Sequence, residues 1–212
     1  MPLIVHSNIL PQGQYAIWQT RETDDFFLSV LDLYPQESYE LQMLKSKKKS
    51  EWLSSRYLLH QLSGRTLRGA CLKDPYGKPY LQGSDHFISV SHTLDFTAVI
   101  AGLIPVGIDI QCVVEKIQRI SPKFVREDEL LFIPEMNRIL FFHAIWGAKE
   151  SMYKAYGKKE LDFKNHMKIS PFVFDPQGFY FDGEIKKNDF FRKYRLFCSL
   201  TSNIILVYAT EQ

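Results

Sequence analysis

The stretch "IWGAKESMYKAYGKK", residues 145–159, decides how this chain is interpreted. Its apolar residues recur at helical spacing and Gly157 is a typical helix end, so we predict a helix over 137–157. Glu150 and Lys154 lie four residues apart and therefore share one face of that helix. Apolar and aromatic neighbours surround them, which favours a functional site over a solvated surface ion pair.

A second acidic residue lies in a predicted strand, within "VGIDIQCVV" at 106–114. Asp109 and Gln111 are two residues apart and point to the same side of this strand. Burying a carboxylate is costly unless it is paired, hydrogen-bonded or bound to a metal. The simpler alternative to a metal site is that Asp109 accepts hydrogen bonds from a nearby helix N-terminus. Together, Asp109 and Glu150 would suit one Mg²⁺, with lysines neutralising a phosphate leaving group. The pattern therefore indicates phosphoryl chemistry on a small molecule.

The remaining elements predict an α+β fold. Helical spacing covers 24–31 and 37–64, and a further helix is expected near Ser121, capped by that residue with Pro122 in its first turn. The predicted strands are 15–20, 86–93, 96–102, 104–115 and several within 167–210, where "DPQG" and "FDGE" are expected turns. Both halves combine helices with antiparallel strands, so we expect two similar lobes, residues 1–104 and 105–212.

Composition excludes several function classes. The 26 Lys and Arg residues nearly balance the 24 Asp and Glu residues, which disfavours a nucleic-acid partner. The 3 cysteines have no metal-ligand spacing and suit a reducing compartment. No secretory signal is recognisable, and no apolar run reaches the roughly 18–20 residues of a membrane span. We therefore expect a cytoplasmic protein that does not enter a membrane.

Basic residues upstream of the acidic pair form a weaker pattern. Lys48 and Arg56 are eight residues apart on a predicted helix, Lys78 lies on a turn, and His92 ends a strand. Each is more simply a solvated or structural residue when taken alone. Taken together, they resemble a cradle for several phosphate groups.

The order of motifs resembles a known family. "VGIDI" (106–110) followed by "WGAKESMYKAYGK" (146–158) resembles the signature pair of the 4'-phosphopantetheinyl transferases, of the long, surfactin-synthetase-activating type. That family combines a Gly-(Ile/Val)-Asp strand with a helix of the form Trp-x-x-Lys-Glu-(Ser/Ala)-x-x-Lys. Further similar segments are "EWLSSRYLL" (51–59), "YGKPYL" (76–81) and "FISVSHT" (87–93), in the family's order. The resemblance covers about residues 45–160.

The resemblance implies a reaction, a cofactor and a fold. The enzyme would transfer the phosphopantetheine arm of coenzyme A to a serine of an apo acyl or peptidyl carrier protein, with Mg²⁺, releasing 3',5'-ADP. Carriers of fatty acid, polyketide or non-ribosomal peptide biosynthesis all qualify. The fold would comprise two pseudo-symmetric lobes, each a small antiparallel sheet packed against helices, with coenzyme A in the cleft between them. Such a chain would function as a monomer.

The resemblance also implies roles for the acidic site. Asp109 and Glu150 match the metal ligands, and Lys154 matches the lysine near the pyrophosphate, where it would stabilise or protonate the departing ADP. Glu150, directly or through a metal-bound water, would deprotonate the attacking serine. Many relatives have an acidic residue at the position of Gln111. The amide would bind the metal through its oxygen or through a water, or would lie outside the coordination sphere.

The basic residues match coenzyme A contacts in the same way. Lys78 and His92 correspond to phosphate ligands, with His92 at the 3'-phosphate, and Ser91 corresponds to a further coenzyme A-binding residue. Lys48 and Arg56 correspond to basic phosphate ligands by a looser alignment. Glu129, in "REDEL", matches an acidic residue that recurs at the start of a helix without a clear role.

Two other classes of function are compatible with parts of this pattern. Mg²⁺-dependent nucleases also combine Asp, Glu and Lys, but they usually place Glu-x-Lys on one strand, whereas Glu150 and Lys154 have helical spacing. A non-catalytic relative that binds coenzyme A or a carrier protein is favoured only by Gln111. The complete set of Asp109, Glu150 and Lys154 favours an enzyme.

Overall fold

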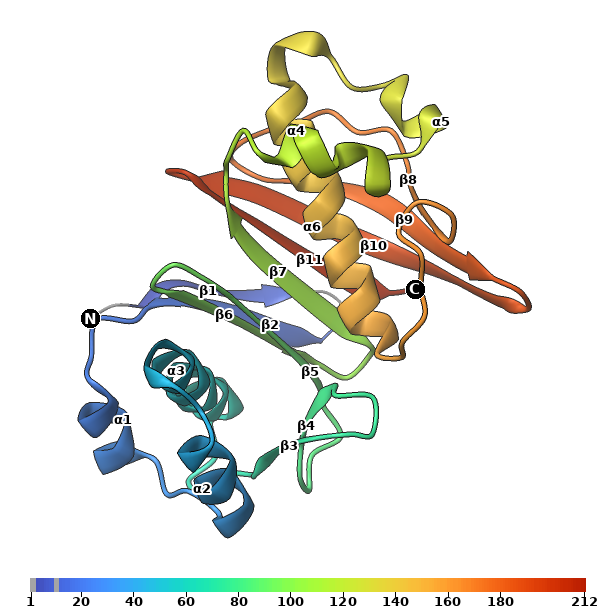
Figure 1. The fold of residues 1–212 in the computed structure, drawn as a ribbon. Helices are drawn as coiled ribbons and strands as arrows, with labels where there is room; N and C mark the ends of the chain where they lie inside the picture. The colour runs from blue at the N-terminus through green and yellow to red at the C-terminus, as the bar shows by residue number, and fades with distance from the viewer. Residues whose placement is uncertain (1–2, 10–11) are drawn as a thin grey trace. The chain divides into compact units, whose positions relative to one another are not determined.

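The computed structural model describes residues 3–9 and 12–212, which divide after Ile104 into two compact units. Each unit contains one antiparallel sheet with helices packed on it (Figure 1). The prediction of an α+β fold is therefore confirmed. Among the described residues, no helix combines the length and apolar character that a membrane span requires.

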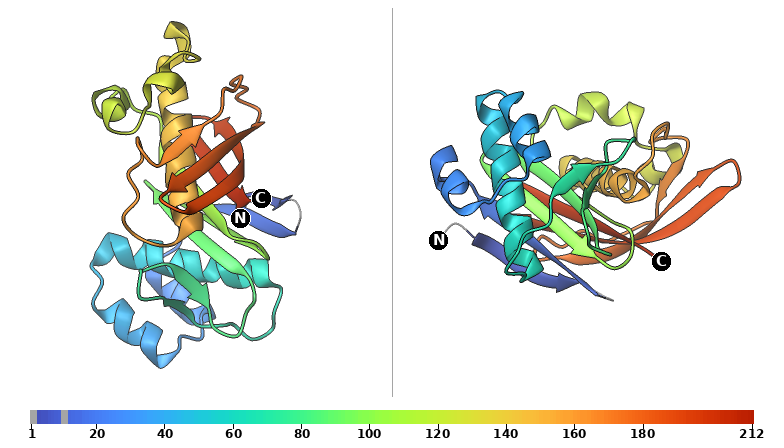
Figure 2. Two further views of the ribbon diagram at one scale, coloured as in Figure 1. Left: turned by 90° about the vertical axis from the view of Figure 1, so that its right-hand side faces the viewer. Right: turned by 90° about the horizontal axis from the view of Figure 1, so that it is seen from below.

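The first unit has a sheet of order β1-β2-β6-β5-β4-β3. Its long helix α3 packs on this sheet through Leu58 and Leu59, and α1 packs on α3 through Phe27 and Leu53 (Figure 2). The elements are β1 (Leu3–Ile9), β2 (Gly13–Gln19), α1 (Asp24–Val30), α2 (Pro35–Gln42), α3 (Ser46–Ser63), β3 (Cys71–Lys73), β4 (Pro79–Leu81), β5 (Phe87–Thr93) and β6 (Phe96–Gly102).

The second unit has a sheet of order β7-β11-β10-β9-β8, with the long helix α6 lying along one face (Figures 1 and 2). Two short α-helices and two 3₁₀ turns connect β7 to α6. The elements are β7 (Val106–Cys112), α4 (Ile117–Ile120), η1 (Ser121–Lys123), α5 (Glu127–Leu130), η2 (Glu135–Asn137), α6 (Arg138–Tyr156), β8 (Met167–Ile169), β9 (Phe179–Lys187), β10 (Phe190–Thr201) and β11 (Ile204–Glu211).

The two units repeat one topology. Apart from β1, each unit has one strand (β2 or β7), then short helices, a long helix and four further strands. The last strand pairs with the first, and the remaining strands follow in reverse chain order, so β2-β6-β5-β4-β3 corresponds to β7-β11-β10-β9-β8. Helices α3 and α6 occupy the same place in this order. The strand β1, which the sequence analysis missed, extends the first sheet at the edge formed by β2.

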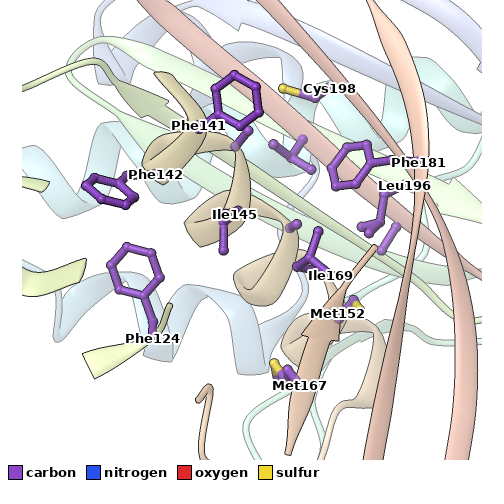
Figure 3. Close-up of a cluster of buried hydrophobic side chains, with 14 of the residues drawn as sticks. Phe124, Phe141, Phe142, Ile145, Met152, Met167, Ile169, Phe181, Leu196 and Cys198 are labelled. Carbon is purple, nitrogen blue, oxygen red and sulfur yellow. The ribbon is translucent and has the colours of Figure 1, made fainter. Parts of the chain in front are cut away.

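The apolar residues of α6 pack against side chains of the sheet, such as Phe181 and Leu196, to form the core of the second unit (Figure 3). Ile145 and Met152 are fully buried, and Phe141 stacks on Phe172 with ring centroids 4.9 Å apart. Trp146 contacts the ring of Phe124 edge to face at 4.9 Å. Burial of this surface is the main stabilising term for the unit and fixes the rotation of α6 about its axis.

Glycines allow β7 to lie directly against α6. A Cβ added at Gly107 would lie 1.9 Å from the carbonyl oxygen of Ser151, so only glycine permits this approach. A Cβ at Gly147 would lie 2.9 Å from Gln111 Nε2. The contact of strand and helix therefore runs from Gly107 beside Ser151 to Gln111 beside Gly147. Asp109 lies between these two contacts on β7.

The prediction of one helix over 37–64 is wrong, because α2 and α3 are separate helices. Glu37 is fully buried and lies 3.4 Å from Arg56, which belongs to α3. In one continuous helix, 19 residues would separate these side chains by about 28 Å along the axis. The chain must reverse to form this ion pair, which needs tertiary contacts that local spacing does not reveal.

The prediction of a helical segment beginning near Ser121 is confirmed only in part. The 3₁₀ turn η1 begins at Ser121 and contains Pro122, but Ile120 and not Ser121 is its N-cap, and α5 begins only at Glu127. Phe124 interrupts the helix because its side chain is buried and its carbonyl accepts a 2.7 Å hydrogen bond from Lys149. That carbonyl is therefore held by a tertiary contact with α6.

The expected turn at "FDGE", residues 181–184, lies instead within the strand β9. Gly183 pairs with Tyr194 in the sheet. A Cβ at Gly183 would lie 2.9 Å from Met152 Sδ. This glycine therefore leaves room for the Met152 side chain above the sheet. A glycine in a strand and a glycine in a turn look alike in the sequence, so the sequence alone did not reveal this role.

Candidate active site

Strand β7 and helix α6 bring three predicted site residues together. Lys154 Nζ lies 2.9 Å from Asp109 Oδ1 and 2.8 Å from the carbonyl oxygen of Ile108. Asp109 is 8% exposed, so its charge is compensated within the unit and not by bulk water. Lys154 of α6 thus forms an ion pair with Asp109 of β7, and its hydrogen bond to the Ile108 carbonyl fixes the direction of the lysine side chain.

Glu150 is electrostatically coupled to this pair. Burial raises the pKa of the Glu150 carboxyl, the negative charge of Asp109 raises it further, and Lys154 partly offsets both effects. The carboxylates of Asp109 and Glu150 are therefore close enough to repel each other. Two carboxylates held in such proximity are a typical feature of cation-binding and acid-base sites.

The available donors fit an ion that needs few protein ligands. Among the residues that the structure describes, no group of three or more His, Cys, Asp or Glu side chains could hold a metal. Mg²⁺ is usually held by one or two carboxylates together with waters and substrate phosphate oxygens. Asp109 and Glu150 satisfy that requirement, and their mutual repulsion favours a cation between them.

Gln111 lies beside this site and contacts α6. Its Nε2 is 3.2 Å from Asp109 Oδ2 and 3.2 Å from the carbonyl oxygen of His143, and its Oε1 is 2.7 Å from His143 Nδ1. The sequence analysis missed His143. His143 lies in an apolar run, four residues before Gly147 and therefore on the same face of the helix. A polar side chain within that apolar run is the one sequence signal that could have identified it.

Glu129 is enclosed by backbone and side-chain donors of the second unit. It is 1% exposed and accepts hydrogen bonds from the backbone N–H groups of Arg126 and Ile169, both at 2.8 Å. Lys149, which is fully buried, donates to it at 2.8 Å. Glu129 therefore links α5, β8 and α6, an arrangement that explains why a lysine is buried in the middle of α6.

A separate basic pocket of about 380 Å³ lies in the first unit. Lys48, Arg56 and His92 line it, so three of the predicted phosphate contacts come together there. Lys73, which the sequence analysis missed, adds a further positive charge. Its position at the end of a short strand before a turn gave no functional signal.

Arg56 is held rigidly in the wall of this pocket. Its side chain is 6% exposed and forms ion pairs with Glu37 at 3.4 Å and Glu40 at 3.3 Å. Its guanidinium carbon lies 3.3 Å from the ring centroid of Trp52. The guanidinium is thus partly neutralised by carboxylates before any anion binds.

The predicted contacts on β5 are His92 and Ser91, and Lys78 lies on the turn between β3 and β4. His92 Nε2 lies 2.8 Å from the carbonyl oxygen of Glu51, and Ser91 is buried in β5. Lys78 follows Gly77, whose φ of 90° forms the turn, and its Nζ lies 5.8 Å from the ring centroid of Phe87. Lys78 is not among the residues that line the basic pocket.

Comparison with known proteins points to one family for this site. Residues 105–207 match the 4'-phosphopantetheinyl transferase superfamily. The match includes Asp109, Gln111, Glu150 and Lys154. The chain is also 31% identical over 111 residues to the protein named "4'-phosphopantetheinyl transferase gsp" of Aneurinibacillus migulanus. That alignment covers 51% of this chain and 46% of the relative, so the chain spans about half the length of the curated relative it matches.

Proposed function

We propose that this chain is a 4'-phosphopantetheinyl transferase of the long, surfactin-synthetase-activating type. In this proposal it transfers the phosphopantetheine arm of coenzyme A to a serine of an apo acyl or peptidyl carrier protein and releases 3',5'-ADP. The observation that carries the proposal is the convergence of Asp109, Glu150 and Lys154 on β7 and α6. The match of residues 105–207 to the transferase superfamily supports it independently.

Asp109 and Glu150 are the groups that would hold Mg²⁺. When bound, this ion would neutralise charge on the pyrophosphate of coenzyme A and orient it for attack. Without a bound ion, burial and the charge of Asp109 raise the pKa of Glu150, so its carboxylate takes up a proton or a cation more readily than an exposed glutamate. The remaining chemistry falls to side chains of the protein.

The transfer step balances with the groups present. The serine oxygen of the carrier forms a bond to the phosphorus that bears pantetheine, while the bond from that phosphorus to the ADP oxygen breaks. Glu150 accepts the serine proton, and Lys154 stabilises or protonates the departing ADP oxygen. The contact of Lys154 with Asp109 and Ile108 supports this role because it holds the ammonium beside the proposed metal ligand.

The basic pocket of the first unit is the proposed site for phosphate groups of coenzyme A. Lys48 and His92 offer positive charge or a hydrogen-bond donor around a volume of about 380 Å³, and Lys73 also lines it but is paired with Glu40 at 2.6 Å. Arg56 contributes less free charge, because Glu37 and Glu40 already pair with it. We propose that Lys78 and Ser91, outside the residues that line this pocket, contact other oxygens of the same ligand.

A mass measurement on a carrier protein tests the proposal. Purified protein is incubated with coenzyme A, Mg²⁺ and an apo carrier, and the carrier is weighed by mass spectrometry. A gain of one phosphopantetheine group is expected, together with release of 3',5'-ADP. The matched control is Glu150→Gln, which keeps size and removes the base. Unchanged carrier mass with every class of carrier would refute the transferase.

The same sample separates the alternatives. Glu150 and Lys154 lie on a helix, α6, which weakens the comparison with nucleases that carry Glu-x-Lys on a strand. Cleavage of DNA by the protein with Mg²⁺ would nevertheless revive that alternative. Binding of coenzyme A without any change in carrier mass would indicate a non-catalytic relative.

A further inference from the structure

Two side chains outside the proposed catalytic groups, His143 and Gln111, form a series of hydrogen bonds that ends at Asp109. Gln111 follows Asp109 by two residues on β7, and His143 lies in the first half of α6 with 2% of its surface exposed. Gly147, one turn after His143, leaves the space that the Gln111 amide occupies, because a Cβ there would lie 2.9 Å from Nε2. The contact is therefore built into the packing of β7 on α6.

The direction of each hydrogen bond follows from the backbone. The N–H of Val114 lies 2.9 Å from His143 Nε2, and since a backbone N–H can only donate, this ring nitrogen must accept. A ring nitrogen that accepts a hydrogen bond carries no proton, so the ring is neutral. A neutral ring that accepts at Nε2 carries its proton on Nδ1. The Nδ1–H then donates to Gln111 Oε1 at 2.7 Å, although the Val114 carbonyl also lies 3.1 Å from Nε2.

The orientation of the Gln111 amide follows in turn. With Oε1 directed at His143, the NH₂ group faces Asp109 Oδ2 and the His143 carbonyl oxygen, each at 3.2 Å. Lys154 occupies the other oxygen of Asp109. Both carboxylate oxygens of Asp109 therefore have a fixed donor, and Gln111 presents hydrogens and not an oxygen to it.

We infer that His143 and Gln111 form a positioning pair, in which His143 fixes the Gln111 amide so that it donates to Asp109 and does not ligate the metal. The inference rests on the proposed function for the role of Asp109 as a Mg²⁺ ligand. Partners that orient metal ligands typically change metal affinity by about 10- to 100-fold when mutated. The pair would keep the Asp109 carboxylate oriented through the hydrogen bond from Gln111.

Two substitutions of His143 separate its two hydrogen bonds. His143→Asn places an amide NH₂ near the position of Nδ1 and retains a donor for Gln111. His143→Gln reaches the position of Nε2 and retains an acceptor for Val114 N–H. We expect His143→Gln to weaken Mg²⁺ binding by about 10-fold or more and His143→Asn by clearly less. Isothermal titration calorimetry with Mg²⁺ alone measures this without any substrate.

A second set of measurements tests whether His143 acts through Gln111. Gln111→Ala with His143 intact should weaken Mg²⁺ binding, and adding His143→Gln should then have little further effect. In the wild-type protein, ¹⁵N NMR of the ring should show Nδ1 protonated and Nε2 unprotonated. These experiments keep the inference testable if one His143 variant fails to fold.

Several outcomes would overturn the inference. These are unchanged Mg²⁺ affinity in Gln111→Ala, an equal effect of His143→Gln in both backgrounds, a proton on Nε2, or no Mg²⁺ binding by the wild-type protein. Failure of the transferase proposal would give a different result. In that case the carrier mass would stay unchanged, while the Mg²⁺ affinities of the His143 and Gln111 variants would still follow the expected order.

Discussion

Lys149 Nζ lies 2.8 Å from Glu129 Oε2, and neither side chain is more than 1% exposed. The lysine also donates to the carbonyl oxygen of Phe124 at 2.7 Å, and the glutamate accepts from the backbone of Arg126 and Ile169. Two charges are thus buried together with their hydrogen-bonding capacity largely used. This ion pair attaches the short segments before α6 to α6 itself and to β8.

Lys149→Met should strongly destabilise the protein, because it leaves the Glu129 carboxylate buried without its partner. Loss of one member of a buried pair typically costs about 3–5 kcal/mol of unfolding free energy. Urea denaturation followed by circular dichroism measures the change. The exposed Lys158→Met is the matched control and should alter stability by less than about 0.5 kcal/mol. Similar stabilities for both variants would contradict a structural role for the pair.

Glu150→Gln should separate stability from activity. A carboxyl whose pKa is raised in the folded state is destabilised when ionised, so stability from this group is complete only at low pH and is lost as pH rises through the raised pKa. The neutral amide removes that cost, and we expect a higher melting temperature at pH 7 without Mg²⁺. Transfer should fall by about 100-fold or more through loss of the general base. A lower melting temperature or retained transfer would show that Glu150 has another role.

Gly107→Ala should disrupt the contact between β7 and α6. The added methyl group would lie 1.9 Å from the carbonyl oxygen of Ser151, so the backbones must move apart. We expect a loss of about 3 kcal/mol or more of unfolding free energy, and weaker Mg²⁺ binding because Asp109 moves with the strand. Gly64→Ala is the comparison: its Cβ meets nothing within 4 Å, and its φ of 60° costs about 1 kcal/mol. Equal losses in both variants would contradict the close approach.

Stability of the first unit should depend on pH through Glu40. Burial raises the pKa of this carboxyl, but the hydrogen bond from Lys73 and the charges of Arg56 and Lys73 outweigh burial, so the pKa is lowered. A lowered pKa means that the stabilisation is present above the unfolded value of about 4.5 and is lost as pH falls through the folded value.

Glu40→Gln should therefore destabilise the protein by up to about 1 kcal/mol at pH 7, with little difference from wild type near pH 3. Urea denaturation at both pH values measures this. The exposed Glu115→Gln serves as control and should give no pH-dependent difference of this kind. A Glu40→Gln effect of the same size at both pH values would mean that packing, and not charge, explains it.

Local signals explain which parts of the fold could be predicted. The helix expected over 137–157 is α6, Arg138–Tyr156, because helical spacing and the positive φ of Gly157 act within the segment itself. The strands expected at 86–93 and 96–102 are β5 and β6 for the same reason. Glu150 and Lys154 were expected near Asp109 from the order of motifs, and the ion pair of Lys154 with Asp109 shows that these segments meet.

Long-range contacts explain what the sequence left hidden. The burial of Lys149 depends on Glu129, twenty residues away, and the break between α2 and α3 depends on the pairing of Glu37 with Arg56. The place of His143 depends on Gln111, on a different element. Local spacing predicts none of these pairs, because packing and charge bring the two residues of each pair together only in the folded unit.

The backbone contact at Gly107 has a consequence for how this protein tolerates change. Main-chain atoms, and not bulky side chains, set how near β7 comes to α6. A replacement at position 107 therefore displaces the strand that carries Asp109, whereas a replacement in the aromatic interior changes how α6 is turned toward that strand. The distance and the orientation of the site are thus set by different contacts of the same helix.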